Sequence, residues 1–381
     1  MTDFEVVIVG GGMAGVSAAY ELARTHRVVV VEAEAHLAFH STGRSAAMFF
    51  QNYGEGPIRP LTVASHRFLT DPPAHLVDGP LVRPRGALWI ARPEQADSLP
   101  AIADAGAATG TTVVDLTPDE VVSRVPILRR DVLAGGLWEP DPFELDVAAI
   151  HQTYLRGLRR AGGTVLTSVP VSSMEHRRGV WRVTAGDETI IASNVVNAAG
   201  AWGDVVAARA GVEPVGLQPM RRTAFMVSGD PGWATWPFVV NADHDFYFKP
   251  DGSQILCSPA DETPTEPGDV RPDPVDVALA IERINQATTL DIRSVRSEWA
   301  GLRTFAADRS MVIGPDPAEP SFIWLVGQGG TGIQAAPAAA ELVAALVRGE
   351  GTPAHLEDVG VVLEDLSPAR PALAATRLGS V

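Results

Sequence analysis

Three glycines near the N-terminus have the spacing of a loop that binds phosphate groups. Gly10, Gly12 and Gly15 follow the apolar run 4–9 in the order Gly-x-Gly-x-x-Gly. The first glycine permits a tight turn, the second lets the backbone approach a pyrophosphate, and the third lets the next helix pack closely on the strand. Amides at the start of that helix carry partial positive charge and attract phosphate oxygens. The segment therefore predicts a dinucleotide site.

An acidic residue follows this loop at the distance that dinucleotide sites use for a ribose. Glu32 ends a second β-branched run, residues 27–32, about 20 residues after the glycine motif. A carboxylate at this place accepts a hydrogen bond from a free 2′-hydroxyl and repels a 2′-phosphate. The residue therefore favours FAD or NAD over NADP.

A polar loop comes next and offers further groups to a cofactor. Ser41, Thr42 and Ser45 supply hydroxyls, and Arg44 supplies a guanidinium. Such a loop suits phosphate oxygens and the polar edge of a flavin, because hydroxyls, amides and a guanidinium all donate hydrogen bonds.

A second glycine-rich segment lies near the C-terminus. Residues 328–334 read Gln-Gly-Gly-Thr-Gly-Ile-Gln, which predicts a turn that opens a helix near Ile333. The amides and the positive end of that helix would stabilise negative charge on a reduced flavin ring.

An α/β framework is expected to hold these segments. Buried strands are predicted over 4–9, 27–32 and 194–202, helices over 14–23, 61–69, 97–125, 146–161 and 276–289, and several strands within 218–261. The strand-rich part interrupts the nucleotide-binding part, so both domains are discontinuous. We expect a cofactor domain made of 1–82, 145–216 and 298–381 and a substrate domain made of 83–144 and 217–297.

Composition excludes several classes of protein. The net charge of −16 argues against nucleic acid and anionic membranes as partners. The single cysteine, Cys257, excludes an internal disulfide, and no His/Cys cluster has metal-ligand spacing. The N-terminal apolar run has no basic segment before it and is too short to span a membrane. We therefore expect a cytoplasmic protein without a bound metal.

A series of motifs runs along the chain in one register: the first glycine motif, then 40–47, 126–131, 154–157, 195–202, 217–222, 246–250, 299–303 and 328–334. This series resembles the FAD-dependent D-amino-acid oxidase family, and most closely its bacterial D-arginine dehydrogenase branch. The resemblance implies a Rossmann-like FAD-binding domain of the glutathione-reductase type, interleaved with a substrate domain built on a large mixed β-sheet.

The resemblance also implies which residues contact the cofactor. These are Gly10, Gly12, Met13, Ala14, Gly15, Glu32, Ala33, Ser41, Thr42, Arg44, Ser45, Ala46, Ala47, Val171, Ala198, Gly200, Trp202, Arg303, Gly329, Gly330, Thr331, Gly332, Ile333 and Gln334. Cys257 does not match the site at which relatives attach a flavin covalently, so we expect noncovalent FAD.

Two arginines are candidates for holding an amino-acid substrate. Arginine grips a planar carboxylate with two parallel hydrogen bonds, and the resemblance directs both Arg222 and Arg303 at that carboxylate. It also implies that Tyr53 and Tyr247 touch the substrate through their hydroxyls and that the Gly330 carbonyl accepts from the substrate amine. An α-amino group becomes neutral with a modest push from its surroundings, so no strong catalytic base is expected. The protein would hold Cα–H over flavin N5 and exclude water.

The chain departs from the D-arginine enzymes where they bind the substrate side chain. Ala87 stands in place of their acid, Met48 in place of a histidine and Phe50 in place of a threonine, while Trp89 and Phe238 add apolar bulk. A cationic side chain would lack its counter-ion in such a pocket. We therefore expect a neutral or hydrophobic side chain, and expect an acid restored at position 87 to confer activity on basic substrates.

The electron acceptor stays open among a quinone, a carrier protein and oxygen. Sarcosine-type oxidases of the wider family place an oxygen-activating lysine over the flavin, and that place aligns near Cys257. Lys249, the single lysine of the chain, is expected to be a structural cation. This favours a dehydrogenase that reacts poorly with oxygen.

The leading interpretation is oxidative deamination of a D-amino acid to an imino acid, which water hydrolyses to a keto acid and ammonia. One alternative is an oxidase of secondary or small amines, of the sarcosine- or glycine-oxidase type, that produces hydrogen peroxide. Another is a flavin- or NAD-binding module without catalysis.

Overall fold

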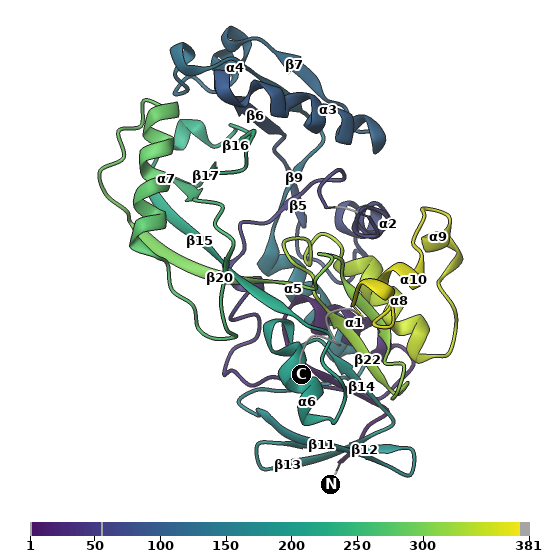
Figure 1. The fold of residues 1–381 in the computed structure, drawn as a ribbon. Helices are drawn as coiled ribbons and strands as arrows, with labels where there is room; N and C mark the ends of the chain where they lie inside the picture. The colour runs from purple at the N-terminus through teal and green to yellow at the C-terminus, as the bar shows by residue number, and fades with distance from the viewer. Residues whose placement is uncertain (1, 55, 374–381) are drawn as a thin grey trace.

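The computed structural model describes residues 2–54 and 56–373, and two large sheets organise this part of the chain (Figure 1). The first sheet has six strands in the order β10 (Thr164–Leu166), β3 (Val28–Val31), β2 (Val6–Val9), β14 (Asn194–Asn197), β22 (Phe322–Val326) and β21 (Val312–Pro315). All neighbours are parallel except β21 and β22. The strands β2 and β3 are buried along their length, as their unbroken apolar runs predict.

Helices cover one face of the six-stranded sheet. Helix α1 (Met13–Ala23) packs against α5 (Val147–Arg160) and α8 (Ala336–Val347), and α8 packs against α2 (Ile58–Thr70). The opposite face is covered by α6 (Gly203–Arg209) and by a smaller sheet of β1 (Thr2–Asp3), β13 (Glu188–Ala192), β12 (Val180–Ala185) and β11 (Val171–Arg177). The first sheet is therefore the middle layer of a three-layer body.

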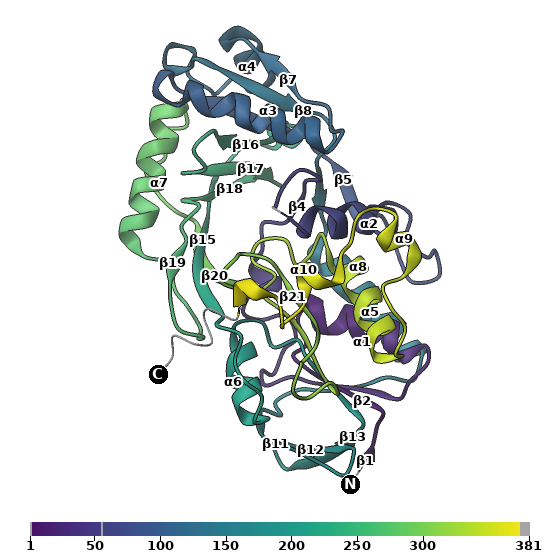
Figure 2. The ribbon, with the colours of Figure 1, turned by 45° about the vertical axis from the view of Figure 1, so that its right-hand side comes forward.

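The second sheet forms the other half of the molecule (Figure 2). Its nine strands are β19 (Thr263–Pro264), β15 (Gln218–Ser228), β18 (Gln254–Ser258), β17 (Tyr247–Asp251), β16 (Phe238–Asn241), β6 (Ala87–Ala91), β8 (Gly135–Glu139), β7 (Val114–Leu116) and β20 (Ser297–Phe305), which pairs with β15. Helices α7 (Pro274–Ala287) and α4 (Pro118–Arg124) pack on one face. The other face, with α3 (Leu99–Ala108), turns toward the first body.

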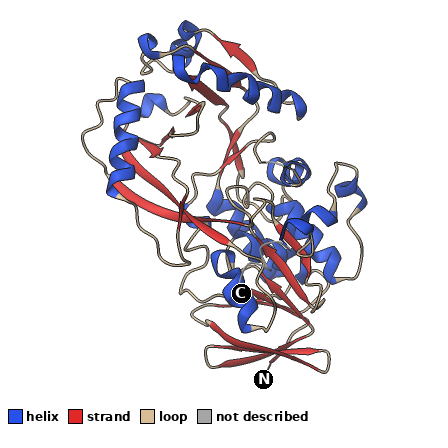
Figure 3. Cartoon of the chain, in the orientation of Figure 1, coloured by secondary structure: helices blue, strands red, loops and turns tan. Residues whose placement is uncertain are grey.

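Two connections join the halves. The long strands β15 and β20 are paired along their length and run from α7 toward the first body (Figure 3). A small sheet of β4 (Met48–Phe49), β9 (Phe143–Leu145) and β5 (Val82–Pro84) forms the second connection. Because β20 pairs with β15, the strand belongs to the nine-stranded sheet. The expected boundary between 297 and 298 had assigned residues 298–305 of this strand to the cofactor domain.

Most predicted elements occur, with differences where the sequence signal is weak. Residues 97–125 hold α3, strand β7 and α4 instead of one continuous helical region. The helix expected near Ile333 begins at Ala336, because the glycine segment continues as turns. The short helices α9 (Ala354–Glu357) and α10 (Leu363–Leu366) follow. Within the described ranges, no helix has the length and apolar character needed to cross a membrane.

Candidate active site

The glycine loop adopts a conformation that requires glycine. Gly10 has a φ of 107°, and a Cβ there would lie 2.5 Å from the Ala198 carbonyl oxygen. A Cβ at Gly15 would lie 1.8 Å from the carbonyl oxygen of Gly10, so only glycine lets α1 pack this closely on β2. The Met13 amide at the start of α1 donates to Oγ1 of Thr42 over 3.0 Å. The loop and the polar segment after β3 are thus held together.

Glu32 and His151 fix the loop from two sides. The Glu32 carboxylate accepts from the Gly11 amide at 2.7 Å and from the Glu34 amide at 2.9 Å. His151 Nε2 lies 3.0 Å from the Gly11 carbonyl oxygen. Burial lowers the pKa of His151, and the hydrogen bond to Gly11 opposes this only in part. The imidazole is therefore held in its neutral form with Nε2 as the donor.

A cavity of about 250 Å³ lies at this loop. The residues predicted to contact the cofactor that line it are Gly10, Gly12, Met13, Ala14, Glu32, Ala33, Ser41, Thr42, Val171, Ala198, Gly200 and Trp202. His40 also lines it, and its Nδ1 atom is buried without a hydrogen-bond partner. The cavity combines a carboxylate, helix amides and apolar walls, which suits the adenosine and pyrophosphate part of a dinucleotide.

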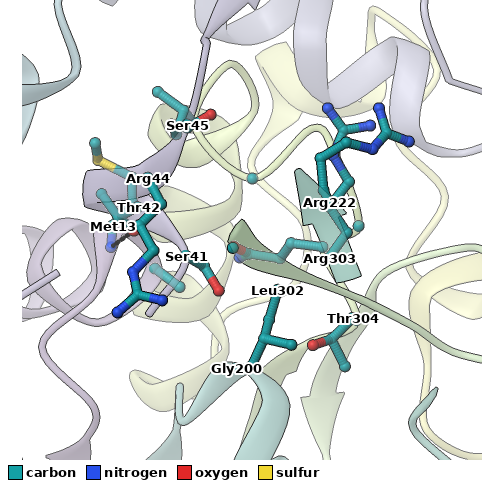
Figure 4. Close-up of a pocket in the computed structure, with 18 of the residues that line it drawn as sticks. Met13, Ser41, Thr42, Arg44, Ser45, Gly200, Arg222, Leu302, Arg303 and Thr304 are labelled. Atoms are coloured by element: carbon teal, nitrogen blue, oxygen red, sulfur yellow. Dashed lines mark hydrogen bonds between the residues drawn. The ribbon is translucent and has the colours of Figure 1, made fainter. Parts of the chain in front are cut away.

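A second cavity continues toward the nine-stranded sheet (Figure 4). Its lining includes the predicted residues Met13, Ala14, Ser41, Thr42, Arg44, Ser45, Ala46, Gly200, Arg303, Gly329, Gly330, Gly332 and Ile333. Gln328 was not among the residues predicted to contact the cofactor. It lines this cavity, the cavity at the glycine loop and a third cavity between the two large sheets. Its Nε2 atom is buried without a partner. Gln328 and His40 thus offer unused polar atoms along one path, so the residues fit an extended dinucleotide such as FAD.

Two of the residues predicted to contact the cofactor form side-chain hydrogen bonds with other parts of the protein. The Arg44 guanidinium donates to the Ala300 carbonyl at 2.8 Å and to Asp269 at 2.6 Å, and Figure 4 shows it across the cavity from Arg222 and Arg303. The Gln334 side chain accepts from the Phe50 amide at 3.1 Å and donates to Thr62 at 3.1 Å. Both residues line cavities, but these side-chain bonds hold neighbouring segments in place.

The third cavity, of about 690 Å³, lies between the two sheets. The predicted substrate and cofactor residues that line it are Ser45, Ala46, Ala47, Met48, Phe50, Tyr53, Trp89, Arg222, Phe238, Tyr247, Arg303, Gly330, Thr331 and Gln334. Residues that the sequence did not indicate also line it, among them Asn52, Ile102, His244, Glu262, Asp308 and Arg309. These residues lie on loops and on α3, and tertiary packing brings them to the cavity. No local sequence motif marks them.

Strand register brings the two arginines to the cavity. Arg222 on β15 pairs with Gly301 on β20, and Arg303 pairs with Met220. Paired residues of antiparallel strands point to the same face, so both guanidinium groups leave the sheet on the cavity side. A Cβ at Gly330 would lie 2.9 Å from Nη1 of Arg303. The glycine segment thus lies directly against that guanidinium.

The two guanidinium groups differ in their surroundings. Burial and then the positive charge of Arg303 lower the pKa of Arg222. Burial also tends to lower the pKa of Arg303, but the phenols of Tyr53 and Tyr247, followed by Glu262, outweigh it, so this pKa is raised. Both arginines remain cationic at neutral pH, because arginine loses its proton only at very high pH.

Ala87 does not line the cavity. It is fully buried on β6, between Phe238 of β16 and Glu139 of β8 in the strand register. Glu139 is an acidic residue that the sequence analysis did not indicate. Its carboxylate accepts hydrogen bonds from Trp89 Nε1 at 2.6 Å and from Asn52 Nδ2 at 3.0 Å. Burial raises the pKa of Glu139. The expected contact of Ala87 with a substrate is therefore replaced by a buried network behind Trp89.

Lys249 and Cys257, the two residues considered in connection with the flavin, do not line the substrate cavity. Lys249 pairs with Glu144 on β9, and Arg85 donates to the same carboxylate. Lys249 is therefore a structural cation that joins β17 of the nine-stranded sheet to the small three-stranded sheet. Cys257 is buried in the apolar cluster beneath α7, on the face of the sheet away from the cavity. Burial raises the pKa of its thiol. Within the described residues, no group of three or more His, Cys, Asp or Glu side chains is arranged to hold a metal.

Comparisons with known proteins agree with this geometry. Residues 5–346 match the DAO family model, described as FAD dependent oxidoreductase. Glycine oxidase of Bacillus licheniformis is 26% identical over 357 residues, which cover 91% of this chain and 93% of that protein. "FAD-dependent oxidoreductase domain-containing protein 1" of Bos taurus is 27% identical over 395 residues, which cover 90% and 81%.

Solved structures show the same fold. The crystal structure of glycine oxidase from Geobacillus kaustophilus has a TM-score of 0.86 at 23% identity and covers 97% of this chain and 99% of that one. The structure of L-proline dehydrogenase from P. horikoshii has a TM-score of 0.83 at 21% identity, with 96% and 97% covered. The chain is thus a member of the DAO family of FAD-dependent oxidoreductases, with FAD as its cofactor and an α/β fold that joins a Rossmann-like domain to a mixed substrate sheet.

Proposed function

We propose that this oxidoreductase deaminates an α-amino acid with a neutral or hydrophobic side chain. The product is an imino acid, which water hydrolyses to a keto acid and ammonia. The observation that carries the proposal is the pair Arg222 and Arg303 on one face of β15 and β20, at the cavity shared with the glycine segment. FAD, when bound, supplies the hydride acceptor at its N5 atom.

The protein's own groups orient the substrate in this proposal. Arg303, with Arg222 beside it, binds the carboxylate, because a guanidinium holds a carboxylate by two parallel hydrogen bonds. The Gly330 carbonyl accepts from the substrate amine, and the hydroxyls of Tyr53 and Tyr247 contact the substrate. With both ends held, Cα–H faces one direction, which supplies the alignment that hydride removal needs.

The cavity walls support an uncharged substrate side chain. Trp89, Phe238, Val240 and Ile102 are apolar lining residues, and the acids in or behind the lining are already engaged. Asp308 pairs with Arg370 at 2.7 Å, and Glu262 pairs with Arg222 at 3.0 Å and with Arg309 at 2.9 Å. A cationic side chain would have to compete with an arginine for either carboxylate.

The D configuration of the substrate rests on a narrower argument. The ordered motifs resemble the D-arginine dehydrogenase branch of the family, while the side-chain positions of that branch are not retained. We propose the D-enantiomer on this ground. Paired D- and L-forms of leucine, methionine and phenylalanine test it, since the opposite preference would contradict the assignment.

A second candidate is an oxidase of glycine or of N-methyl amino acids. It is favoured by the 26% identity to a glycine oxidase over 91% of this chain. The place of the single lysine favours the first candidate, because Lys249 is bound to Glu144 and does not line the cavity. We propose an acceptor other than oxygen, a quinone or a carrier protein.

One experiment separates the two candidates. The FAD-loaded protein is supplied with neutral D-amino acids, glycine and N-methylglycine, both with an artificial electron acceptor and with oxygen alone. Fast acceptor reduction by D-leucine or D-phenylalanine with little hydrogen peroxide supports the proposal. Preferred turnover of glycine or N-methylglycine with stoichiometric hydrogen peroxide supports the second candidate instead.

A further inference from the structure

One carboxylate in the wall of the substrate cavity forms ion pairs with two guanidinium groups. Glu262, just beyond β18, accepts from Arg222 Nη2 at 3.0 Å. Its two oxygens lie 3.1 and 2.9 Å from Nη2 of Arg309. Arg309 in turn lies over the Phe305 ring, 3.8 Å from its centroid. Glu262, Arg222, Arg309 and Phe305 all line the cavity, so the pairs belong to its wall.

Arg222 is therefore partly occupied before any substrate arrives. Besides its bond to Glu262, its Nε donates to the Asp261 carbonyl at 2.7 Å. Arg303 contrasts with it: in the part of the chain that the structure describes, no carboxylate lies within ion-pair distance of its guanidinium. Arg222 therefore has Glu262 as its counter-ion, whereas Arg303 has no counter-ion among the described residues.

The cavity wall holds more positively charged side chains than free carboxylates. Arg222 and Arg303 are both partly buried, with 13% of the Arg222 side chain accessible, and Glu262 neutralises one of these two positive charges. Arg309 is half exposed, with 52% of its side chain accessible, so water screens its charge. Asp308 is engaged by Arg370. Arg59 also lines the cavity, and its Nε donates to the Gly54 carbonyl at 2.8 Å. Of the two arginines on β15 and β20, Arg303 is the one whose charge Glu262 does not pair with, which matches a ligand that carries one carboxylate.

We propose that Glu262 is a specificity-determining residue that restricts the cavity to ligands with a single carboxylate. A second carboxylate could bind between Arg222 and Arg309 only where Glu262 already lies, and two like charges at that place would repel each other. The inference rests on the proposed function, since it requires that Arg222 and Arg303 receive a carboxylate. It adds that dicarboxylic amino acids are rejected.

The test compares two unreactive ligands of equal chain length, butyrate and succinate. Each is titrated into the FAD-loaded protein, and binding is followed by the change in flavin absorbance and by calorimetry. The wild type is expected to bind butyrate more tightly. In Glu262→Gln, which keeps an oxygen for Arg222 but removes the charge, the ratio of the butyrate to the succinate dissociation constant should rise by about tenfold or more.

Two further variants make the result specific. Glu262→Ala removes both the charge and the oxygen, and should shift the ratio in the same direction. Glu298→Gln is the matched control, because Glu298 is an exposed acid on β20 and carries the same charge change without contact to Arg222. Its ratio should stay that of the wild type. FAD content and melting temperature of each variant verify that it is folded.

The outcomes separate this inference from the proposed function. If the wild type binds butyrate but the ratio does not change in either Glu262 variant, the inference about Glu262 is wrong and the proposed function stands. An equal rise in Glu298→Gln would likewise overturn it, as a general effect of charge. If the wild type binds neither ligand, both the inference and the proposed carboxylate site are contradicted.

Discussion

Arg222 and Arg303 lie on neighbouring strands, and the residue directly opposite Arg222 is Gly301, two positions before Arg303. This diagonal register places side chains on one face at roughly 7–8 Å between their backbones, within reach of the two oxygens of one carboxylate. The space beside Gly301 is filled by Arg44, because a Cβ at position 301 would lie 3.2 Å from the Arg44 Cβ atom. A single strand pairing thus assembles a site from residues far apart in the sequence.

Replacing Gly15 by alanine should prevent correct assembly of the cofactor loop. A Cβ there would lie 1.8 Å from the Gly10 carbonyl oxygen, and a backbone atom in a buried turn cannot move aside cheaply. We expect a loss of about 3 kcal/mol or more in the free energy of unfolding, together with loss of bound FAD. Denaturant unfolding and the ratio of flavin to protein absorbance measure both effects.

Gly351→Ala is the matched control for this change. A Cβ at Gly351 meets no atom within 4 Å, so stability and FAD content should stay close to those of the wild type. A Gly15→Ala protein that retained FAD and stability would contradict the packing described for α1 on β2.

His151 should make the stability of the protein sensitive to acid. Burial lowers its pKa below the ordinary value of 6.5, so the unfolded chain takes up a proton at a higher pH than the folded one. The stabilisation is present above pH 6.5 and is lost as the pH falls toward the pKa of the folded state. The melting temperature should therefore fall between pH 7.5 and 5.5.

The variant His151→Gln tests the origin of this acid sensitivity. Glutamine has a donor for the Gly11 carbonyl but does not titrate. The fall in melting temperature between pH 7.5 and 5.5 should be smaller in this variant than in the wild type. An equal fall in both proteins would assign the effect to other groups.

Lys249→Met should affect stability and leave the reaction with oxygen unchanged. Lys249 is buried and paired with Glu144, and removing one partner of a buried ion pair costs about 3 kcal/mol. The free energy of unfolding should fall by that order, while the rate at which oxygen reoxidises the reduced flavin should change less than about twofold. Denaturant unfolding and stopped-flow absorbance give the two values, and a tenfold slower reoxidation would place the ammonium at the flavin.

Ala87→Glu is now expected to destabilise the sheet rather than to create a site for basic substrates. Ala87 is fully buried and lies opposite Glu139 in the strand register, so the new carboxylate would be forced against an acid whose pKa is already raised by burial. The melting temperature should fall, and D-arginine should not become a substrate. Turnover of D-arginine by this variant would restore the expectation drawn from the sequence.

The sequence predicted those parts of the site that depend on local rules. The Gly10 turn and the start of α1 follow from glycine conformation and a buried β-branched strand, so they could be located within one residue. The family resemblance then directed attention to Arg222, Arg303 and Gly330, which line one cavity.

Other features could not be predicted because they depend on packing between distant segments. The bond of Glu262 to Arg222 and that of Glu139 to Trp89 join loops and strands that no local pattern links. Arg44 was expected at the cofactor, but Asp269 lies far along the chain and binds its guanidinium. The strand β7 was missed because a segment of three residues between two helices carries too little periodicity to be recognised.

The most direct test of the account follows the colour of the FAD-loaded protein without oxygen. Neutral D-amino acids are added to the wild type and to Arg303→Lys, which keeps the positive charge but loses the two-pronged grip on a carboxylate. The account predicts that D-leucine or D-phenylalanine bleaches the wild-type flavin rapidly and that Arg303→Lys, with FAD still bound, is reduced at least about 100-fold more slowly. Equal rates of bleaching in the two proteins, or no bleaching of the wild type by any amino acid, would contradict it.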